Sequence, residues 1–154
     1  MAAKRRVVVS GSAGVIGRRV CAALVESTEA DVVGLDRDEP LWVVPGVDDK
    51  QVDLVRADVD ALFEGADVVV HLASALRADA LDPAEGVEDQ LLVHRVLDAV
   101  DRSGVGQLVM MSSAMVYGAW ADNPVPLTED APIRPNPDFA WAVHKTELER
   151  MATT

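Results

Sequence analysis

The sequence predicts an α/β fold in three layers, α/β/α: a doubly wound parallel sheet with helices on both faces. Strand-like and helix-like runs alternate along the chain, which favours parallel strands joined by crossover helices. Residues 68–70 are three consecutive valines, typical of a strand buried on both faces. A glycine-rich segment, residues 11–17, joins the first strand directly to a helical pattern. These three observations define the fold class.

The first half of the chain supplies four of the expected strands. Residues 6–10 form a β-branched run that ends at Gly11, and residues 16–24 follow with apolar side chains at helical spacing. Three further strands follow, each a short apolar run: residues 31–35, 52–55 and 66–72. Residues 60–63 predict a short helix before the last of these strands.

The second half alternates in the same way. Residues 87–100 have helical apolar spacing, Ser103 and Gly104 close this helix, and residues 107–112 predict the fifth strand. Residues 122–137 hold five of the eight prolines and therefore predict a loop before a last helix at 139–151. A doubly wound sheet normally continues with another strand. We therefore expect one domain, residues 1–154, truncated after its last helix and without a substrate domain.

Composition excludes several classes of partner. The chain has 49% hydrophobic and 26% charged residues, as in ordinary globular proteins, and a net charge of −12. That charge argues against a nucleic-acid partner, which needs a basic face. Cys21 is the single cysteine and is expected in the core. No apolar run reaches the length of about 18 residues that a membrane span needs. We expect a cytoplasmic protein with no membrane partner and no metal site.

Three glycines form the most informative motif. Gly11, Gly14 and Gly17 are spaced G-x-x-G-x-x-G between a strand and a helix, as in a Rossmann-like phosphate turn. The first allows a tight turn, the second lets the backbone approach a diphosphate, and the third allows close packing of the helix. The diphosphate then meets free N–H groups and the positive end of the helix dipole. A glycine-rich turn without any ligand is the alternative.

An acid follows at the expected distance. Asp36 ends the second strand, about twenty residues beyond the glycine turn, where dinucleotide-binding domains carry an acidic residue. Its carboxylate would accept hydrogen bonds from both ribose hydroxyls and repel a 2′-phosphate, which favours NAD over NADP. Arg37 could instead pair with a 2′-phosphate, so NADP stays open as the less favoured cofactor.

Four motifs, in this order, resemble those of a known family. They are Ser10-Gly11-Ser12-Ala13-Gly14-Val15-Ile16-Gly17, Asp58-Val59, His71-Leu72-Ala73-Ser74 and Ser112-Ser113-Ala114-Met115-Val116-Tyr117-Gly118. Over essentially the whole chain, the sequence resembles the extended short-chain dehydrogenase/reductase family of NAD-dependent sugar epimerases and dehydratases. In that family the first motif is the phosphate loop, the second contacts adenine after the third strand, and the third passes beneath the cofactor. Each motif taken singly could be structural; His71, for example, could be a strand-end histidine.

The resemblance implies a set of site residues. Those for the cofactor are Gly11, Ala13, Gly14, Val15, Ile16, Gly17, Asp36, Arg37, Asp58, Val59, Leu72, Ala73, Ser74 and Lys145. Ser113 matches the catalytic serine that orients the substrate oxygen, and Lys145 matches the lysine that holds the nicotinamide ribose. The family's catalytic tyrosine stands four residues before that lysine, where this chain has Trp141.

The substitution at position 141 affects the expected chemistry. An indole N–H donates a hydrogen bond but exchanges no proton near neutral pH, and general acid–base catalysis is worth about 10²–10⁴ in rate. We therefore expect impaired catalysis, with His144 and Tyr117 as candidate substitutes for the proton carrier. Asp89 stands where the family has an asparagine that supports the active-site water network.

Three functions are compatible with these residues. The leading hypothesis is the NAD-binding domain of an oxidoreductase of epimerase/dehydratase type, whose substrate is a nucleotide sugar or another hydroxy or keto compound. A non-catalytic dinucleotide-binding module and a structural partner of another chain are the alternatives. The resemblance also implies a homodimer built on residues 87–100 and 139–151.

Overall fold

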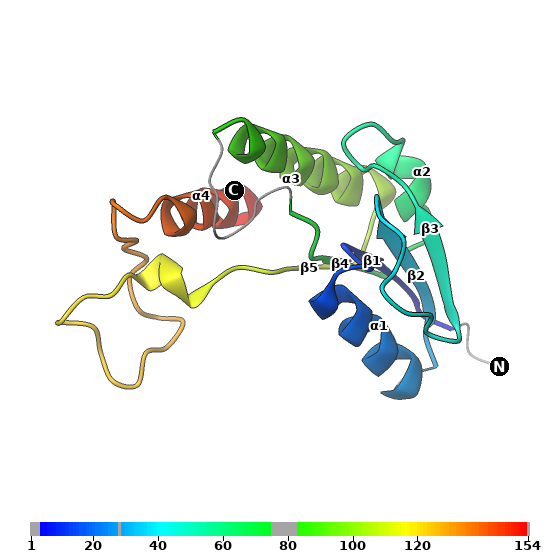
Figure 1. Ribbon diagram of the computed structural model, residues 1–154, viewed down its shortest axis with the longest axis horizontal. Coiled ribbons are helices and arrows are strands. Elements are labelled where there is room, and N and C mark those ends of the chain that lie inside the picture. The colour runs from blue at the N-terminus through cyan, green and yellow to red at the C-terminus, as the bar shows by residue number, and fades with distance from the viewer. Residues whose placement is uncertain (1–3, 28, 75–82, 154) are drawn as a thin grey trace. The chain divides into compact units, whose positions relative to one another are not determined.

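The computed structural model describes residues 4–27, 29–74 and 83–153, which divide into two compact units (Figure 1). The first unit comprises Met1–Ala75 and Leu91–Met111, and the second comprises Leu76–Gln90 and Ser112–Thr154. The helix α3, Pro83–Ser103, begins in the second unit and continues into the first.

The first unit is a parallel α/β sheet. Its strands are β1 (Arg6–Ser10), β2 (Asp31–Asp36), β3 (Val47–Gln51), β4 (Val68–His71) and β5 (Gln107–Met110). All neighbours pair in parallel, in the order β3-β2-β1-β4-β5. From β1 the chain first builds outward through β2 and β3, then returns to β4 on the other side. The carboxyl ends of β1 and β4 therefore form the topological switch point, where ligands bind in doubly wound sheets.

Helices cover both faces of this sheet. The helix α1 (Val15–Ser27) packs against one face, and α2 (Val59–Phe63) and the C-terminal part of α3 cover the other (Figure 1). Valines in β1 alternate between the two faces: Val7 and Val9 belong to the core beneath α1, and Val8 to the core beneath α2 and α3. The Rossmann-like three-layer fold expected from the sequence is confirmed.

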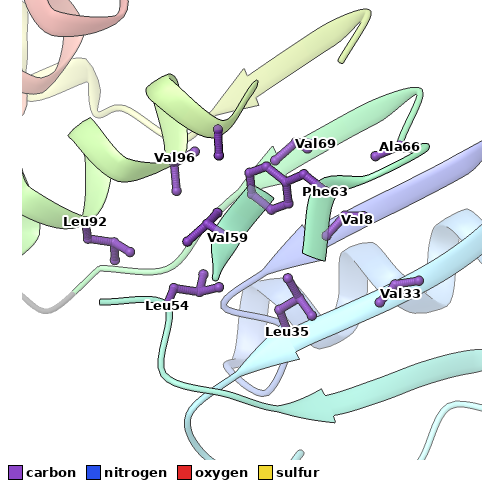
Figure 2. Packing of buried hydrophobic residues seen from close by; sticks show 11 residues of the cluster. Val8, Val33, Leu35, Leu54, Val59, Phe63, Ala66, Val69, Leu92 and Val96 are labelled. Atoms are coloured by element: carbon purple, nitrogen blue, oxygen red, sulfur yellow. The ribbon is translucent and has the colours of Figure 1, made fainter. Parts of the chain in front are cut away.

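The core beneath α2 and α3 is centred on Phe63, which is fully buried (Figure 2). Strand register places Val33 and Val69 on either side of Val8, so three valines form a row across the sheet beneath Phe63. Burying each such side chain contributes about 1.5–3 kcal/mol. On the other face, Cys21 is buried in the smaller core, where desolvation raises the pKa of its thiol, and its expected core position is confirmed.

The third strand corrects the sequence-based expectation, which placed it at residues 52–55. The structure has β3 at Val47–Gln51, whose sequence Val-Asp-Asp-Lys-Gln carries no apolar pattern because it is an exposed edge strand. The apolar residues Val52, Leu54 and Val55 come after the strand and pack into the core beneath α2 and α3. Their apolar run reflects burial of a loop rather than strand pairing.

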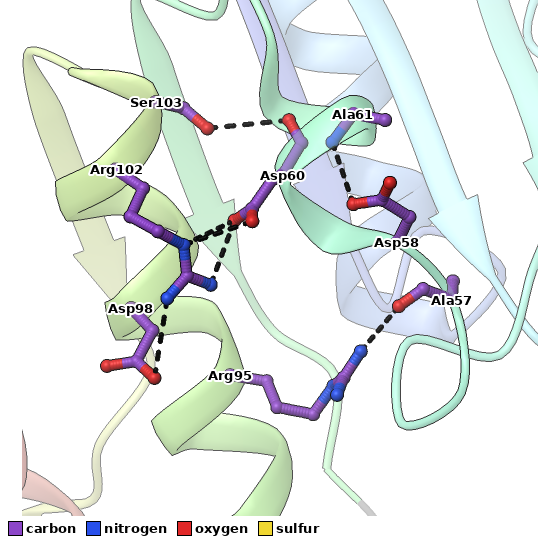
Figure 3. A network of polar contacts seen from close by, with 8 residues as sticks. All are labelled: Ala57, Asp58, Asp60, Ala61, Arg95, Asp98, Arg102 and Ser103. Carbon is purple, nitrogen blue, oxygen red and sulfur yellow. Dashed lines mark hydrogen bonds and ion pairs between the residues drawn. The ribbon is translucent and has the colours of Figure 1, made fainter.

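Polar contacts hold that loop against α3 (Figure 3). The guanidinium of Arg95 donates to the carbonyl oxygens of Leu54 and Ala57 at 3.2 and 2.5 Å. Arg102 forms two-pronged hydrogen bonds with Asp60, on α2, at 3.0–3.2 Å. Arg95 thus joins the segment between β3 and α2 to α3, and Arg102 joins α2 itself to α3.

The second unit contains the N-terminal part of α3, the 3₁₀ turn η1 (Ala114–Tyr117) and α4 (Ala140–Thr153). Within this unit η1 and α4 pack against each other. Among the helices of the described ranges, none combines the length and the apolar character that crossing a bilayer requires.

Candidate functional site

The glycine turn lies at the carboxyl end of β1, beside the end of β4. Gly11 has a φ of +74°, and a Cβ there would lie 2.6 Å from the backbone nitrogen of Ala73. Glycine is therefore required at position 11, both for the left-handed backbone and for the close passage of the segment after β4. Leu72 N–H also donates to Ser10 C=O at 3.1 Å, which fixes the third predicted motif against the first.

The other two glycines differ in their surroundings. A Cβ at Gly17 would collide with the carbonyl oxygen of Gly11, so α1 can start this close to the turn only with glycine there. Among the described residues, a Cβ at Gly14 would meet only Gly11 O, at 3.5 Å, an ordinary van der Waals contact. Position 14 could thus hold a Cβ without a collision with these residues, whereas Gly11 and Gly17 are needed for packing. Val15 and Ile16, which follow, are exposed at the start of α1.

Asp36 connects the end of β2 to the glycine turn. Its Oδ2 accepts a hydrogen bond from Ala13 N–H at 2.9 Å, and its Oδ1 accepts one from Asp38 N–H at 3.0 Å. Because a carboxylate has about four acceptor sites, capacity for further hydrogen bonds remains. Asp36 also lines a pocket of about 390 Å³ between the glycine turn and the ends of β2 and β3.

Sequence reasoning found only part of this pocket. Asp36 was predicted, but Ser12, Asp38, Glu39 and Asp49 also line it. The acidic residues after position 36 were a visible signal, whereas Asp49 could be placed only once β3 was known. Arg37 is exposed outside the lining and pairs with Asp38 at 3.9 Å.

The predicted adenine pair lies at the start of α2. The Asp58 carboxylate caps this helix by accepting from Ala61 N–H at 3.3 Å (Figure 3), and Val59 is buried in the core. However, β3 ends at Gln51, and the first acidic residue followed by an apolar one after this strand is Asp53, followed by Leu54. This pair precedes Asp58-Val59 in the chain. Asp53 is therefore a second candidate for the adenine contact, beside the predicted Asp58.

His71 is a strand-end residue. It is buried at the end of β4, and its Nδ1 shares a 2.6 Å hydrogen bond with Ser10 Oγ at the end of β1. This bond joins the two strands at the switch point. It favours the structural interpretation of His71 over that of a base or ligand. Ser74, three residues on, is half-buried.

Ser113, Trp141 and Lys145 all belong to the second unit. Ser113 is the N-cap of η1, and its Oγ accepts from Met115 N–H at 3.3 Å. Trp141 and Lys145 stand one turn apart on α4, with the Lys145 ammonium 4.9 Å from the centre of the indole ring. The helix therefore presents an aromatic face to the lysine, at the position where the resemblance expects a hydroxyl.

Lys145 is buried, with only 5% of its surface exposed. Burial lowers the pKa of its ammonium, and the Asp89 carboxylate acts in the opposite direction, raising this pKa. A cation–π contact with Trp141 also favours the charged form. Asp89 and Trp141 thus provide the negative potential that this buried cation needs.

His144 and Asp89 form a buried pair in the same unit. His144 Nε2 lies 3.0 Å from Asp89 Oδ2, and because a carboxylate only accepts, the imidazole is the donor. Gln90 Nε2 also donates to Glu147 Oε2 at 2.9 Å, so α3 and α4 are joined twice within this unit. His144, a candidate proton carrier from the sequence, is thus engaged by Asp89.

Removing the Asp89 carboxylate should destabilise the protein strongly. Asp89→Ala leaves His144 without its acceptor and Lys145 without a nearby negative charge, and we expect a loss of about 2–3 kcal/mol. Urea denaturation at neutral pH measures this loss. Asp101→Ala, an exposed acid on the same helix, is the matched control and should change stability little. Equal stability of the two variants would contradict the proposed importance of the buried pair.

Comparisons with known proteins identify the family and support the fold. A family model described as the NAD dependent epimerase/dehydratase family matches residues 7–154. A dTDP-glucose 4,6-dehydratase of Streptomyces antibioticus is 33% identical over 158 residues, covering 92% of this chain and 47% of that protein. The chain therefore spans about half the length of this relative.

Solved structures give the same result. MoeE5 in complex with UDP-glucuronic acid and NAD superposes with a TM-score of 0.81 at 30% identity, covering 96% of this chain and 48% of that one. Uronate dehydrogenase from Agrobacterium tumefaciens superposes with a TM-score of 0.78 at 25% identity, covering 97% and 55%. Each similarity extends over nearly all of this chain and about half of the other.

Proposed function

Because this chain belongs to the NAD dependent epimerase/dehydratase family, we propose that it binds NAD(H) as the dinucleotide-binding part of an oxidoreductase that acts on a nucleotide sugar. The glycine turn is the observation that carries this proposal. A Cβ at Gly11 or Gly17 would collide with neighbouring backbone, whereas at Gly14, just before α1, it would meet the described residues only in an ordinary contact with Gly11 O. This is the cradle that a diphosphate requires.

The residues around the turn suit the rest of the cofactor. The Asp36 carboxylate, on the wall of the adjoining pocket, accepts the ribose hydroxyls with the capacity left by Ala13 and Asp38. We place adenine against the segment from Asp53 to Asp58, between β3 and α2; Val59, which the resemblance also implies, is buried in the core. Leu72, Ala73 and Ser74 pass beneath the cofactor, as the resemblance implies.

Reaction chemistry belongs to the second unit. When bound, NAD would supply hydride transfer; by the resemblance, Lys145 would hold the nicotinamide ribose and Ser113 would orient the substrate oxygen. Trp141 has no group that gains or loses a proton near neutral pH, so we expect the proton step to be impaired. The nucleotide-sugar class is supported by similar proteins whose complexes contain UDP-glucuronic acid or UDP-glucose.

A non-catalytic dinucleotide-binding module is the second candidate. The observation that favours it is the Trp141 ring, 4.9 Å from the Lys145 ammonium where the family has a titratable hydroxyl. A structural partner of another chain is a third possibility. The homodimer and the cytoplasmic location expected from the sequence stay predictions.

Two measurements separate these functions. Fluorescence titration with NADH tests for the cofactor site, and turnover with UDP-glucose, UDP-glucuronate and dTDP-glucose tests for catalysis. NADH binding with slow turnover supports the oxidoreductase, and binding without turnover supports the non-catalytic module. Absence of NADH binding would overturn both and leave the structural partner.

Asp36→Ala should weaken NADH binding about tenfold, because one charge-assisted hydrogen-bond acceptor for the ribose is lost. NADPH should bind the variant no worse than it binds the unmutated protein, since the repelling charge is gone. Parallel titrations with the two cofactors measure this change. Asp31→Ala, an exposed acid at the other end of β2, is the control. Equal affinity of the unmutated protein for NADH and NADPH would contradict the proposed discrimination.

A further inference from the structure

The pocket beside Asp36 has a strongly acidic lining. Its charged residues are Asp36, Asp38, Glu39, Asp49 and Lys50, four carboxylates and one ammonium. Lys50 pairs with Asp48 at 3.7 Å. A ligand group with two hydroxyls suits these acceptors, whereas a phosphate dianion meets mostly like charge.

A buried arginine lies one residue behind this lining. Arg18, in the first turn of α1, is completely buried, and its Nη1 donates to Asp49 Oδ1 at 2.6 Å. The Asp49 side chain is 26% exposed and lines the pocket, but Arg18 does not. Asp49 therefore stands between the guanidinium and the pocket.

Two further nitrogens of this guanidinium, Nε and Nη2, are buried and have no hydrogen-bond partner among the described residues. Arginine stays protonated in proteins, and a buried charge without a partner is costly. Asp49 is the acidic partner that compensates Arg18, while donor capacity for an additional anion remains. Guanidinium donors of this kind bind phosphate well.

Gly34 makes this arrangement possible. A Cβ at position 34, in β2, would lie 2.5 Å from Asp49 Oδ1 and 2.7 Å from Ser12 Oγ. The missing side chain lets Asp49 and Ser12 approach the sheet side by side, where both line the pocket. The buried pair is thus built into the strand pairing of β2 with β3, which sets Gly34 opposite Asp49.

We propose that Asp49 is a second cofactor-specificity residue: it occupies Arg18 and adds a negative charge to the pocket wall, so that a 2′-phosphate is rejected and NAD is preferred. The inference rests on the proposed NAD-binding function and adds a residue to the one discriminating acid predicted from the sequence. Without the charge of Asp49, the Arg18 guanidinium lies next to the residues that line the pocket, with hydrogen-bond donors that have no partner among the described residues.

The test compares two probes that differ by one phosphate, adenosine 5′-monophosphate and adenosine 2′,5′-bisphosphate. Isothermal titration calorimetry gives the ratio of their dissociation constants for the unmutated protein and for Asp49→Asn. We expect Asp49→Asn to shift this ratio by about tenfold or more toward the bisphosphate, since the repelling carboxylate is removed and the Arg18 guanidinium loses its acidic partner. Asp31→Asn, which removes the same charge far from the pocket, should leave the ratio unchanged.

A double variant separates attraction by Arg18 from loss of repulsion. Arg18→Gln/Asp49→Asn has neither charge, so its ratio should lie between those of the unmutated protein and Asp49→Asn. It also provides a readout if the single variant fails to fold, because it leaves no buried charge uncompensated. The inference would be overturned if either the double variant or a folded Asp49→Asn protein gave the same ratio of dissociation constants as the unmutated protein. If the unmutated protein binds neither NADH nor adenosine 5′-monophosphate, both the proposed function and this inference fail. If it binds NADH but Asp49→Asn leaves the ratio of dissociation constants unchanged, only this inference fails.

Discussion

Valine in place of Gly14 should abolish NADH binding while the protein remains folded. Within the part of the chain that the structure describes, the Cβ position of Gly14 has only one neighbour, Gly11 O at 3.5 Å, which leaves room for a side chain. A diphosphate on the helix N-terminus needs the same space. We expect the dissociation constant for NADH to rise by at least about 100-fold, which corresponds to about 2.7 kcal/mol. Fluorescence titration measures the affinity, and thermal unfolding verifies the fold.

Gly17→Ala is the informative contrast. Its Cβ would collide with Gly11 O, so even a methyl group should displace α1 or the turn and lower stability. The two variants should therefore have different effects: Gly14→Val should lose NADH binding, and Gly17→Ala should lose stability. A folded Gly14→Val protein that binds NADH normally would place the diphosphate elsewhere.

Trp141→Tyr should raise turnover by about 10²–10⁴ if the rest of the site is competent, the range associated with general acid–base catalysis. Trp141 already faces Lys145, with the ammonium 4.9 Å from its ring, so a tyrosine at the same position brings a phenol close to that charge. A neighbouring cation favours the phenolate. The gain should appear in kcat rather than in NADH affinity, because the contacts proposed for phosphate and ribose are unchanged.

The pH profile and a matched variant make this prediction specific. In the direction that abstracts a proton, the gain should fade at low pH as the tyrosine becomes protonated. Trp141→Phe keeps an aromatic ring without the hydroxyl and should show no gain. Fast turnover by the unmutated protein would mean that another residue moves the proton. An equal gain in the Phe and Tyr variants would mean that bulk, and not the hydroxyl, limits the reaction.

Much of the fold and of the cofactor site was predictable because it depends on short-range patterns. The valine runs of β1 and β4 indicate strands buried on both faces, and the spacing of Gly11, Gly14 and Gly17 indicates a strand–turn–helix unit. The cofactor role predicted for Asp36 follows from its position at the end of β2. Such features lie within one element or at its boundary, where local sequence is sufficient.

The third strand was misplaced because its stability comes from pairing with β2. Hydrogen bonds between backbone groups hold β3 in place, so its side chains can be polar and exposed, and they leave no apolar signal. Leu54, by contrast, is buried without belonging to a strand. The misplaced strand also left Asp53, two residues after the end of β3, out of the residues considered for the adenine contact.

The sequence by itself determined the α/β class, the glycine turn, the acid at the end of β2 and the indole four residues before Lys145. Tertiary structure alone decided which distant charges became partners. Arg18 meets Asp49 across 31 positions and His144 meets Asp89 across 55, in each case inside the protein. Nothing in local spacing selects these pairs. They form because folding removes water from the arginine and the imidazole, and a buried polar or charged group is stable only where the fold supplies a partner.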